Sequence, residues 1–136
     1  MQSGVSIVVC CYNSADRLPE TLKHIAQQKV EDYILWEVII VNNHSYDNTV
    51  EVARNLWNTY GCTAPFRIVD EPKSGLSHAR EKGFAEALYS YVLFCDDDNW
   101  LSEVYVQTAY EVMRNDPNLG ALGGKSTAAC EIPPPF

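Results

Sequence analysis

The sequence lacks several features that would place it in common classes of protein. No apolar run approaches the roughly 18 residues of a membrane-spanning helix, and no basic segment precedes the first apolar stretch, as it would in a secretory signal peptide. Internal repeats and low-complexity segments are also absent. With 136 residues, the chain is long enough for one domain with a real core. These absences indicate a soluble, single-domain protein, which we expect in the cytoplasm.

Positive charge is scarce. The chain has 10 Lys and Arg against 18 Asp and Glu, which gives a net charge of −8. Because a surface of this sign repels polyanions, we expect no nucleic-acid partner. An acidic protein that binds a phosphate ligand needs local help from a metal ion, from backbone N–H groups or from a well-placed Arg or Lys.

Paired cysteines are missing as well. The five cysteines are odd in number and include no Cys-x-x-Cys motif, and three of them fall in apolar, strand-like segments. The three histidines show no metal-ligand spacing with them, so a zinc site is not expected. The pattern favours reduced thiols within a cytoplasmic protein.

One stretch of the chain joins an apolar run to a row of carboxylates. Five apolar residues, 91–95, lead directly into Asp96, Asp97 and Asp98. A short continuous apolar run predicts a strand buried on both faces, and alternation along it would turn Asp96 and Asp98 to one side and Asp97 to the other. Adjacent carboxylates repel one another unless a cation lies among them, and Mg²⁺ or Mn²⁺ prefers such oxygen ligands. The alternative is a solvated acidic turn in which Asn99 begins the next helix.

Apolar runs and helical periodicity alternate along the chain. We predict strands over residues 5–11, 36–41, 66–70 and 91–95, with a fifth over 119–123. Between and after them we predict helices over residues 14–28, 48–60, 77–86 and 102–115. The expected N-caps are Ser14, then Asp47 or Ser45, and finally Ser102.

Strict alternation of strands and helices is typical of an α/β fold with a parallel sheet covered by helices on both faces. The half-polar strand 66–70 suits an edge position. In such a sheet every strand ends at the same edge, where ligands bind. Four polar clusters would meet there: residues 12–13, 42–43, 71–75 and 96–98.

The segments that carry these clusters resemble the family 2 glycosyltransferases, and the resemblance runs from Val5 to Gly124. The segments are Val-Val-Cys-Cys-Tyr-Asn, Glu-Val-Ile-Ile-Val-Asn-Asn-His-Ser-Tyr-Asp-Asn-Thr, Gly-Leu-Ser-His-Ala-Arg and Leu-Phe-Cys-Asp-Asp-Asp-Asn-Trp. The resemblance implies a GT-A fold, which is Rossmann-like and mostly parallel, in a truncated form. Residues 1–124 would be its nucleotide-sugar-binding half, and residues 125–136 a tail or the start of the acceptor half.

The resemblance also implies roles for residues at the first two strand ends. Tyr12 and Asn13 match the segment that lines the nucleotide. Asn42 stands where the family usually has an acidic residue that reads the base. An amide oxygen can still accept a hydrogen bond from a base N–H, but the amide is neutral. The base is therefore open, with a UDP-sugar as the expected donor.

Further roles follow for the third and fourth clusters. Gly75, Ser77 and Arg80 match the segment that opens the third helix, where a backbone free of Cβ, a helix N-terminus and a guanidinium suit an anion. Arg80 could instead pair with Glu71 or Asp97. By resemblance, Asp98 is the main ligand of Mn²⁺ or Mg²⁺, while Asp96 or Asp97 reaches the ribose or the metal.

The implied reaction is an inverting, metal-dependent transfer of a sugar to a hydroxyl of a saccharide or lipid-linked acceptor, in the cytoplasm or at the inner face of the membrane. It needs a general base, and Glu103, Glu111 and Glu131 are poor candidates because two were expected within a helix and one in the tail. We therefore expect the base beyond Phe136. A sheet edge left open in a truncated domain could also drive formation of a homo-oligomer.

Two other functions remain open on sequence alone. A phosphohydrolase of the haloacid dehalogenase type also places Asp-x-Asp after a buried strand, but it wants Thr or Val where this chain has Trp100. The second alternative is a nucleotide-binding module without catalysis, which the replacement at Asn42 favours. Sugar transfer by the full gene product would distinguish a transferase from such a module.

Overall fold

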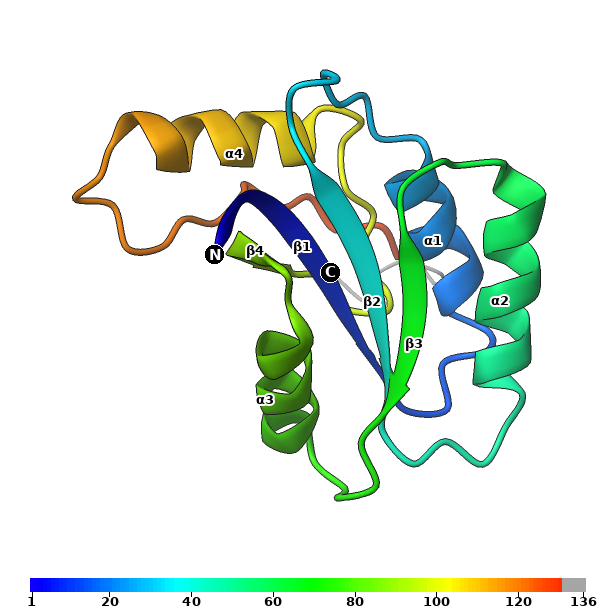
Figure 1. The fold of residues 1–136 in the computed structure, drawn as a ribbon. Helices are drawn as coiled ribbons and strands as arrows, with labels where there is room; N and C mark the ends of the chain where they lie inside the picture. The colour runs from blue at the N-terminus through cyan, green and yellow to red at the C-terminus, as the bar shows by residue number, and fades with distance from the viewer. Residues whose placement is uncertain (131–136) are drawn as a thin grey trace, which may run out of the picture.

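The computed structural model describes residues 1–130, in which four strands and four helices alternate (Figure 1). They are β1 (Gln2–Cys11), α1 (Leu18–Ala26), β2 (Trp36–Asn42), α2 (Thr49–Tyr60), β3 (Phe66–Asp70), α3 (Leu76–Glu86), β4 (Tyr89–Phe94) and α4 (Tyr105–Asn115). The predicted alternation is confirmed. Residues 131–136, which include Glu131 and half of the predicted tail, lie outside the described part.

The four strands form one parallel sheet in the order β3-β2-β1-β4. Cys11 pairs with Asn42, and Asn42 pairs with Asp70, so β1, β2 and β3 end level with one another. All strand ends therefore meet at one edge, as the α/β prediction required. The predicted edge position of β3 is also confirmed.

Helices cover both faces of the sheet, but unequally. Side chains of α1, α2 and α4 pack with alternate residues of β1 and β2 in one core cluster, whereas α3 packs alone on the opposite face (Figure 1). The two central strands are almost wholly buried, because each is flanked by a strand on both sides and by helices above and below.

Helix α3 lies very close to β1. A Cβ atom added at Gly83 would overlap Cγ1 of Val8, so only a residue without a side chain allows this approach. The contact fixes α3, and with it the loop that begins the helix, against the centre of the sheet.

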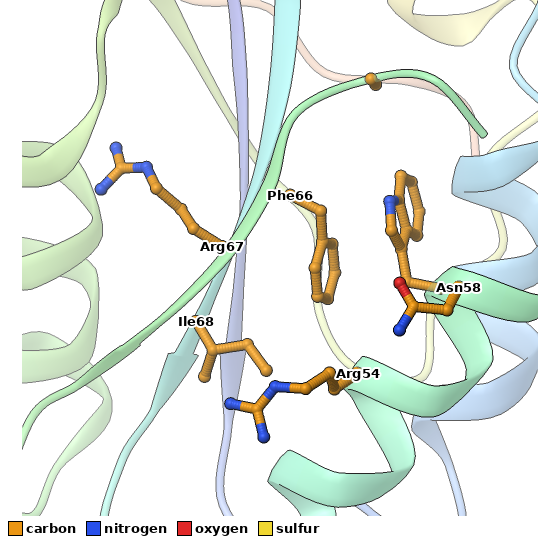
Figure 2. Close-up of a pocket in the computed structure, with 7 residues that line it drawn as sticks. Arg54, Asn58, Phe66, Arg67 and Ile68 are labelled. Carbon is orange, nitrogen blue, oxygen red and sulfur yellow. The ribbon is translucent and has the colours of Figure 1, made fainter. Parts of the chain in front are cut away.

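A buried ion pair joins the sheet to the other end of α3. Glu37, only 1% exposed, accepts hydrogen bonds from Ser6 Oγ at 2.7 Å and from the Leu88 N–H at 2.9 Å. Arg67 Nε lies 3.3 Å from Glu37, and Arg67 Nη1 lies 2.8 Å from Glu86. Figure 2 shows Arg67 leaving β3 on the side opposite Phe66. Because both carboxylate oxygens of Glu37 accept hydrogen bonds and Arg67 carries the opposite charge, the charge is tolerated in the core.

Two strand predictions are wrong. Residues 119–123 form no strand and are mostly exposed, because this glycine-rich segment has few β-branched side chains and pairs with no neighbouring strand. The strand β4 forms, but it is not buried on both faces, and Phe94 is 43% exposed. Its position at the edge, paired only with β1, explains this exposure.

Two predicted N-caps are also wrong. α1 begins at Leu18 rather than after Ser14, whose side chain is engaged elsewhere, and α4 begins at Tyr105, with only the main-chain oxygen of Ser102 accepting from its first N–H. At α2, Asp47 Oδ1 does accept from the N–H of Thr49 at 3.0 Å. None of the helices within residues 1–130 is long and apolar enough to cross a membrane.

Candidate functional site

The candidate site is the carboxyl edge of the sheet where the chain reverses its direction of winding. From β1 the chain adds β2 and then β3 on one side, and it then crosses over the opposite face through α3 to add β4 on the other side of β1. The loops after β1 and β4 meet there, because Asp97 accepts hydrogen bonds from Ser14 Oγ and Arg17 Nη2. Tyr12 and Asn13 follow β1 there, and the three aspartates follow β4.

Asp97 faces α1 and is held firmly. Its carboxylate accepts from Ser14 Oγ and from Arg17 Nη2, the latter at 2.9 Å, and its main-chain oxygen accepts from Thr21 Oγ1 at 2.8 Å. The hydrogen bond and charge of Asp97 raise the pKa of Arg17. Asp97 therefore ties the acidic loop to α1.

Asp96 faces the opposite way, toward α3. Its Oδ1 lies 3.8 Å from Arg80 Nη2, and both side chains are about half exposed. Arg80 thus pairs with Asp96 rather than with Glu71 or Asp97, the two partners considered from the sequence. Asp98 is exposed and makes no side-chain hydrogen bond or ion pair within the described residues. The predicted alternation between Asp96 and Asp97 is confirmed.

Asn13 connects the loops after β1 and β2. Its Oδ1 accepts from the N–H groups of Tyr46 at 2.8 Å and Asp47 at 3.3 Å, and its own N–H donates to Ser45 Oγ at 3.1 Å. The residue has a φ of 47°, in the left-handed region that Asn tolerates better than most residues. Its side-chain oxygen is used in fixing the loop, a role that sequence reasoning did not assign to it.

Exposed aromatic rings stand on these two loops. Tyr12, 51% exposed, meets Tyr46 edge-on with ring centroids 6.4 Å apart. Tyr46 in turn meets His44 edge-on at 5.2 Å. The rings form a partly apolar border beside the polar strand ends, and a nucleoside has the planar shape to lie against it.

Asn42, the last residue of β2, and Asn43, which follows it, hydrogen-bond to different parts of the protein. Asn42 Nδ2 donates to Asp70 Oδ1 at 2.9 Å, and Asn42 Oδ1 accepts from the Ser45 N–H at 3.3 Å. The amide oxygen predicted to face a base N–H therefore already has a donor within the protein.

Asn43 is buried and holds the loop between β3 and α3. Its Nδ2 donates to the main-chain oxygens of Glu71 at 2.9 Å and Lys73 at 2.8 Å, and its Oδ1 accepts from the Gly75 N–H at 3.0 Å. Sequence reasoning missed this role, although a second amide directly after the strand was a signal for it.

The loop that Asn43 holds leads into the N-terminus of α3. Gly75 has a φ of 130° and a ψ of 139°, a conformation open to glycine and strained for other residues. Ser77 follows on the exposed first turn, where the early N–H groups have no acceptor within the helix, and Arg80 is exposed at the start of the second turn. Gly75, Ser77 and Arg80 therefore lie in the part of α3 that is close to Asp96.

The chemistry of the donor set fits a hard divalent ion. Asp96 and Asp98 offer exposed carboxylate oxygens, but residues 1–130 contain no assembled group of three or more Asp, Glu, His or Cys. Mg²⁺ and Mn²⁺ are typically held by one or two carboxylates, with substrate phosphates completing the shell. The residues thus fit an ion that arrives with a phosphate ligand rather than one enclosed by protein.

Two cysteines lie close to the site, Cys10 partly buried and Cys95 buried. Burial raises the pKa of Cys10 to about 11 and that of Cys95 to about 12, so both remain protonated thiols at neutral pH. All five cysteines are free, as expected for reduced thiols.

A pocket elsewhere contains none of the predicted site residues. It has a volume of about 470 Å³ and lies between α2 and β3, with Arg54, Phe66 and Ile68 among its lining residues (Figure 2). The polar strand ends, by contrast, line an open edge.

Comparison with known proteins agrees with this architecture. A mannosyltransferase, PcManGT from Pyrobaculum calidifontis, solved in complex with GDP-Man and Mn²⁺, superposes with a TM-score of 0.74 and 27% identity over 88% of this chain and 34% of its own. TarS from Staphylococcus aureus, residues 1–349, superposes with a TM-score of 0.73 over 93% of this chain and 38% of its own. At 19% identity, that second likeness shows the fold alone.

Sequence relatives point in the same direction. A cholesterol galactosyltransferase from Borreliella burgdorferi is 30% identical over 112 residues, which are 82% of this chain and 30% of the relative. A poly-beta-1,6-N-acetyl-D-glucosamine synthase from Staphylococcus aureus is 30% identical over 122 residues, which are 89% of this chain and 28% of the relative. The chain therefore spans less than a third of the length of these curated relatives.

The sequence profile of the family described as Glycosyl transferase family 2 matches residues 6–130. That range contains all four strand-end clusters. The match is to a glycosyltransferase family and gives no support to the dehalogenase alternative. The GT-A fold of the neighbouring structures is the fold found here. The chain belongs to glycosyl transferase family 2.

Proposed function

We propose that residues 1–124 form the donor-binding half of an inverting glycosyltransferase that moves a sugar from a nucleoside diphosphate to an acceptor hydroxyl. The observation that carries this proposal is the convergence of four clusters from separate parts of the chain on one edge of the sheet. Because the chain belongs to glycosyl transferase family 2, we assign donor binding to that edge.

Each cluster has a proposed role. Tyr12 and Asn13 line the nucleoside, with the exposed ring of Tyr12 available to one face of the base. Gly75, Ser77 and Arg80 bring backbone N–H groups and a guanidinium to the diphosphate. Asp97, fixed to α1, orients the acidic loop toward the ribose.

Asp96 and Asp98 would hold Mn²⁺ or Mg²⁺ together with the diphosphate. A bound divalent ion would offset the charge that develops on the departing nucleoside diphosphate. The PcManGT complex with GDP-Man and Mn²⁺ supports this assignment. A UDP-sugar remains our expected donor.

We assign neither the acceptor site nor the general base to residues 1–124. The names of the relatives, a cholesterol galactosyltransferase and a polysaccharide synthase, support a lipid or saccharide acceptor. We place the base that deprotonates the acceptor hydroxyl beyond Phe136, and the protein in the cytoplasm or at the inner face of the membrane.

Calorimetric titration tests whether binding of the donor depends on a metal ion. We expect UDP or GDP to bind in the presence of Mn²⁺ or Mg²⁺, and binding to be lost when a chelator removes the ion. The reason is that a diphosphate and the row of carboxylates repel each other without a cation on a protein of net charge −8. Equal affinity with and without chelator would reject the metal role.

One observation favours a second candidate, a nucleotide-binding module without transferase activity. The side-chain amide of Asn42 is bonded at both ends within the protein, so the residue expected to read the base has its orientation set by Asp70 and Ser45. Sugar transfer by the full gene product, measured with UDP- and GDP-sugars, separates the two candidates, because a module would bind the donor and transfer nothing.

A further inference from the structure

The pocket between α2 and β3 lies away from the strand ends that carry the predicted site residues. Its part of β3 is the beginning of the strand, whereas the site edge is where the strand ends. The volume of about 470 Å³ is within the range of about 300–1,000 Å³ that is typical of ligand pockets. The lining combines four apolar side chains with two polar ones from α2, and these are Trp57, Ala64, Phe66 and Ile68, with Arg54 and Asn58 (Figure 2).

One polar group in this pocket has no partner. Trp57 is only 5% exposed, and its indole N–H meets no acceptor within residues 1–130. Every fully buried side-chain nitrogen or oxygen in that range has a hydrogen-bond partner, so this N–H belongs to the small exposed part of the residue. The indole stacks on Phe66 with ring centroids 4.8 Å apart and an interplanar angle of 13°, and an N–H in the plane of its ring does not point at a stacked neighbour. The N–H is therefore open to an acceptor that enters the pocket.

Arg54 and Asn58 add further donors on the same side. Arg54 is three residues before Trp57 and four before Asn58 on α2, and side chains at these spacings lie together on one face of a helix. Both are exposed, and neither makes a side-chain hydrogen bond or ion pair within the described part of the chain. The guanidinium of Arg67 is engaged on the other face of the sheet. Because none of the described residues in the lining is Asp or Glu, the pocket offers a free positive charge with no carboxylate beside it.

We propose that this pocket binds a small organic anion, in which a carboxylate or a phosphate is attached to a flat apolar body. The guanidinium of Arg54 matches two oxygens of such a group, and the indole N–H of Trp57 donates to the same group. The apolar body lies against Phe66 and Ile68, where it removes their surface from water. A neutral ligand would leave Arg54 without a counter-charge, and a bare ion would leave the apolar walls wet. The proposal does not depend on the proposed function, because no residue of the pocket is assigned to the donor.

Nuclear magnetic resonance of the isotope-labelled 136-residue chain tests the proposal, in a buffer without divalent ions so that phosphates do not gather at Asp96 and Asp98. The chain has three tryptophans, and the indole N–H signal of Trp57 is the one that Trp36→Phe and Trp100→Phe both retain. We expect benzoate or phenyl phosphate to shift this signal downfield until it saturates, and the tighter of the two identifies the charged group. Benzyl alcohol, which lacks the charge, and inorganic phosphate, which lacks the apolar body, should each bind at least about tenfold more weakly.

The variant Arg54→Gln keeps a long polar side chain and removes the charge. It should weaken binding of the better anion by at least about tenfold and leave binding of benzyl alcohol unchanged. Arg114→Gln is the matched control, because it removes the same charge from α4, outside the pocket, and it should change neither. Thermal unfolding confirms that each variant folds. The proposal is wrong if neither anion moves the Trp57 signal, if benzyl alcohol binds as tightly as the anions, or if both arginine variants weaken binding equally.

Discussion

Three consecutive aspartates have three different environments. Asp97 is bound to Arg17 and Ser14, Asp96 lies near Arg80, and Asp98 is exposed without a partner in the described chain. Alternation along the strand end separates Asp96 from Asp97, and packing of α1 and α3 on opposite faces then supplies each with a different cation. Asp97 therefore engages Oδ2 with α1 and the loop before it, whereas the carboxylates of Asp96 and Asp98 accept no hydrogen bond among the described residues.

We predict that Asp98→Ala lowers metal-dependent binding of UDP or GDP by at least about tenfold, because a charged ligand is lost from the ion. Glu103→Ala is the control. Glu103 is exposed in the turn before α4 and pairs with Lys29 Nζ at 3.0 Å, a surface pair worth at most about 1 kcal/mol. Calorimetry on both variants measures the difference. Equal affinities would mean that the acidic loop is a solvated turn.

The polar loops lead into the helices, and two contacts hold α3 and α2 in position. At α3 the absence of a side chain at Gly83 lets the helix approach β1. At α2 the carboxylate of Asp47 accepts from Thr49 and also, at 3.2 Å, from the Ala15 N–H in the loop before α1. The first contact holds the body of α3 against β1, and the second links the start of α2 to the loop after β1.

Gly83→Ala should destabilise the protein by about 1–3 kcal/mol, through overpacking against Val8. At an open helical position the same change would be stabilising, since Ala is the better helix former. Gly120→Ala is the control, because an added Cβ there meets nothing within 4 Å. Urea unfolding gives both values, and a stabilised Gly83→Ala would show that the close packing of α3 is relaxed in solution.

Asp47 predicts a pH dependence of stability. Burial alone would raise the pKa of Asp47, but hydrogen bonds from Thr49 and Ala15 outweigh it and lower the pKa. A lowered pKa in the folded state means that Asp47 contributes stability above its unfolded pKa and loses it as the pH falls through the folded value.

The stability difference between wild type and Asp47→Asn should accordingly be largest near neutral pH and should shrink below about pH 4, the range in which Asp side chains titrate. Urea unfolding of both proteins from pH 7 to pH 3 measures it. A difference that stays constant across this range would assign the effect to geometry instead of charge.

At the scale of the whole molecule, residues 1–130 form a four-stranded sheet with one helix on one face and three on the other. It brings together the proposed contacts to nucleoside, diphosphate and metal. Carboxylates also stand on the loops at this edge as Asp47, Asp70 and Glu71, but each accepts a hydrogen bond within the protein. Glu111 lies on α4 beside Tyr33 and Gln107, away from the strand ends.

We predict that the 136-residue chain binds the donor but transfers little sugar. A missing general base typically costs about 10²–10⁴-fold in rate, and lost positioning of the acceptor adds to this. The measurement compares product formation by this chain and by the full product of its gene, with UDP- and GDP-sugars and a panel of saccharide and lipid acceptors. Comparable rates would place the base within these residues, with Glu103, Glu111 and Glu131 as the first to test.

The sequence by itself determined the order of the elements and the positions of the four polar clusters. Short apolar runs, such as the one ending at Cys95, indicate strands, and segments with apolar residues at helical spacing separate them. Both patterns can be recognised locally because they reflect which side chains are buried. Since parallel strands share one carboxyl edge, the meeting of Tyr12, Asn42, Gly75 and Asp98 at that edge also followed from the pattern.

Only the tertiary structure decided the partners within that edge. Arg17 and Asp97 are 80 residues apart, and Asn42 and Asp70 are 28 apart, so no local pattern could join them. The sheet order placed β4 at an edge and left Phe94 exposed, although its sequence resembles that of a central strand. Side chains such as Ser14, suited to a helix cap by local propensity, took stronger partners across the fold, because a hydrogen bond to a charged group outweighs one to a neutral N–H.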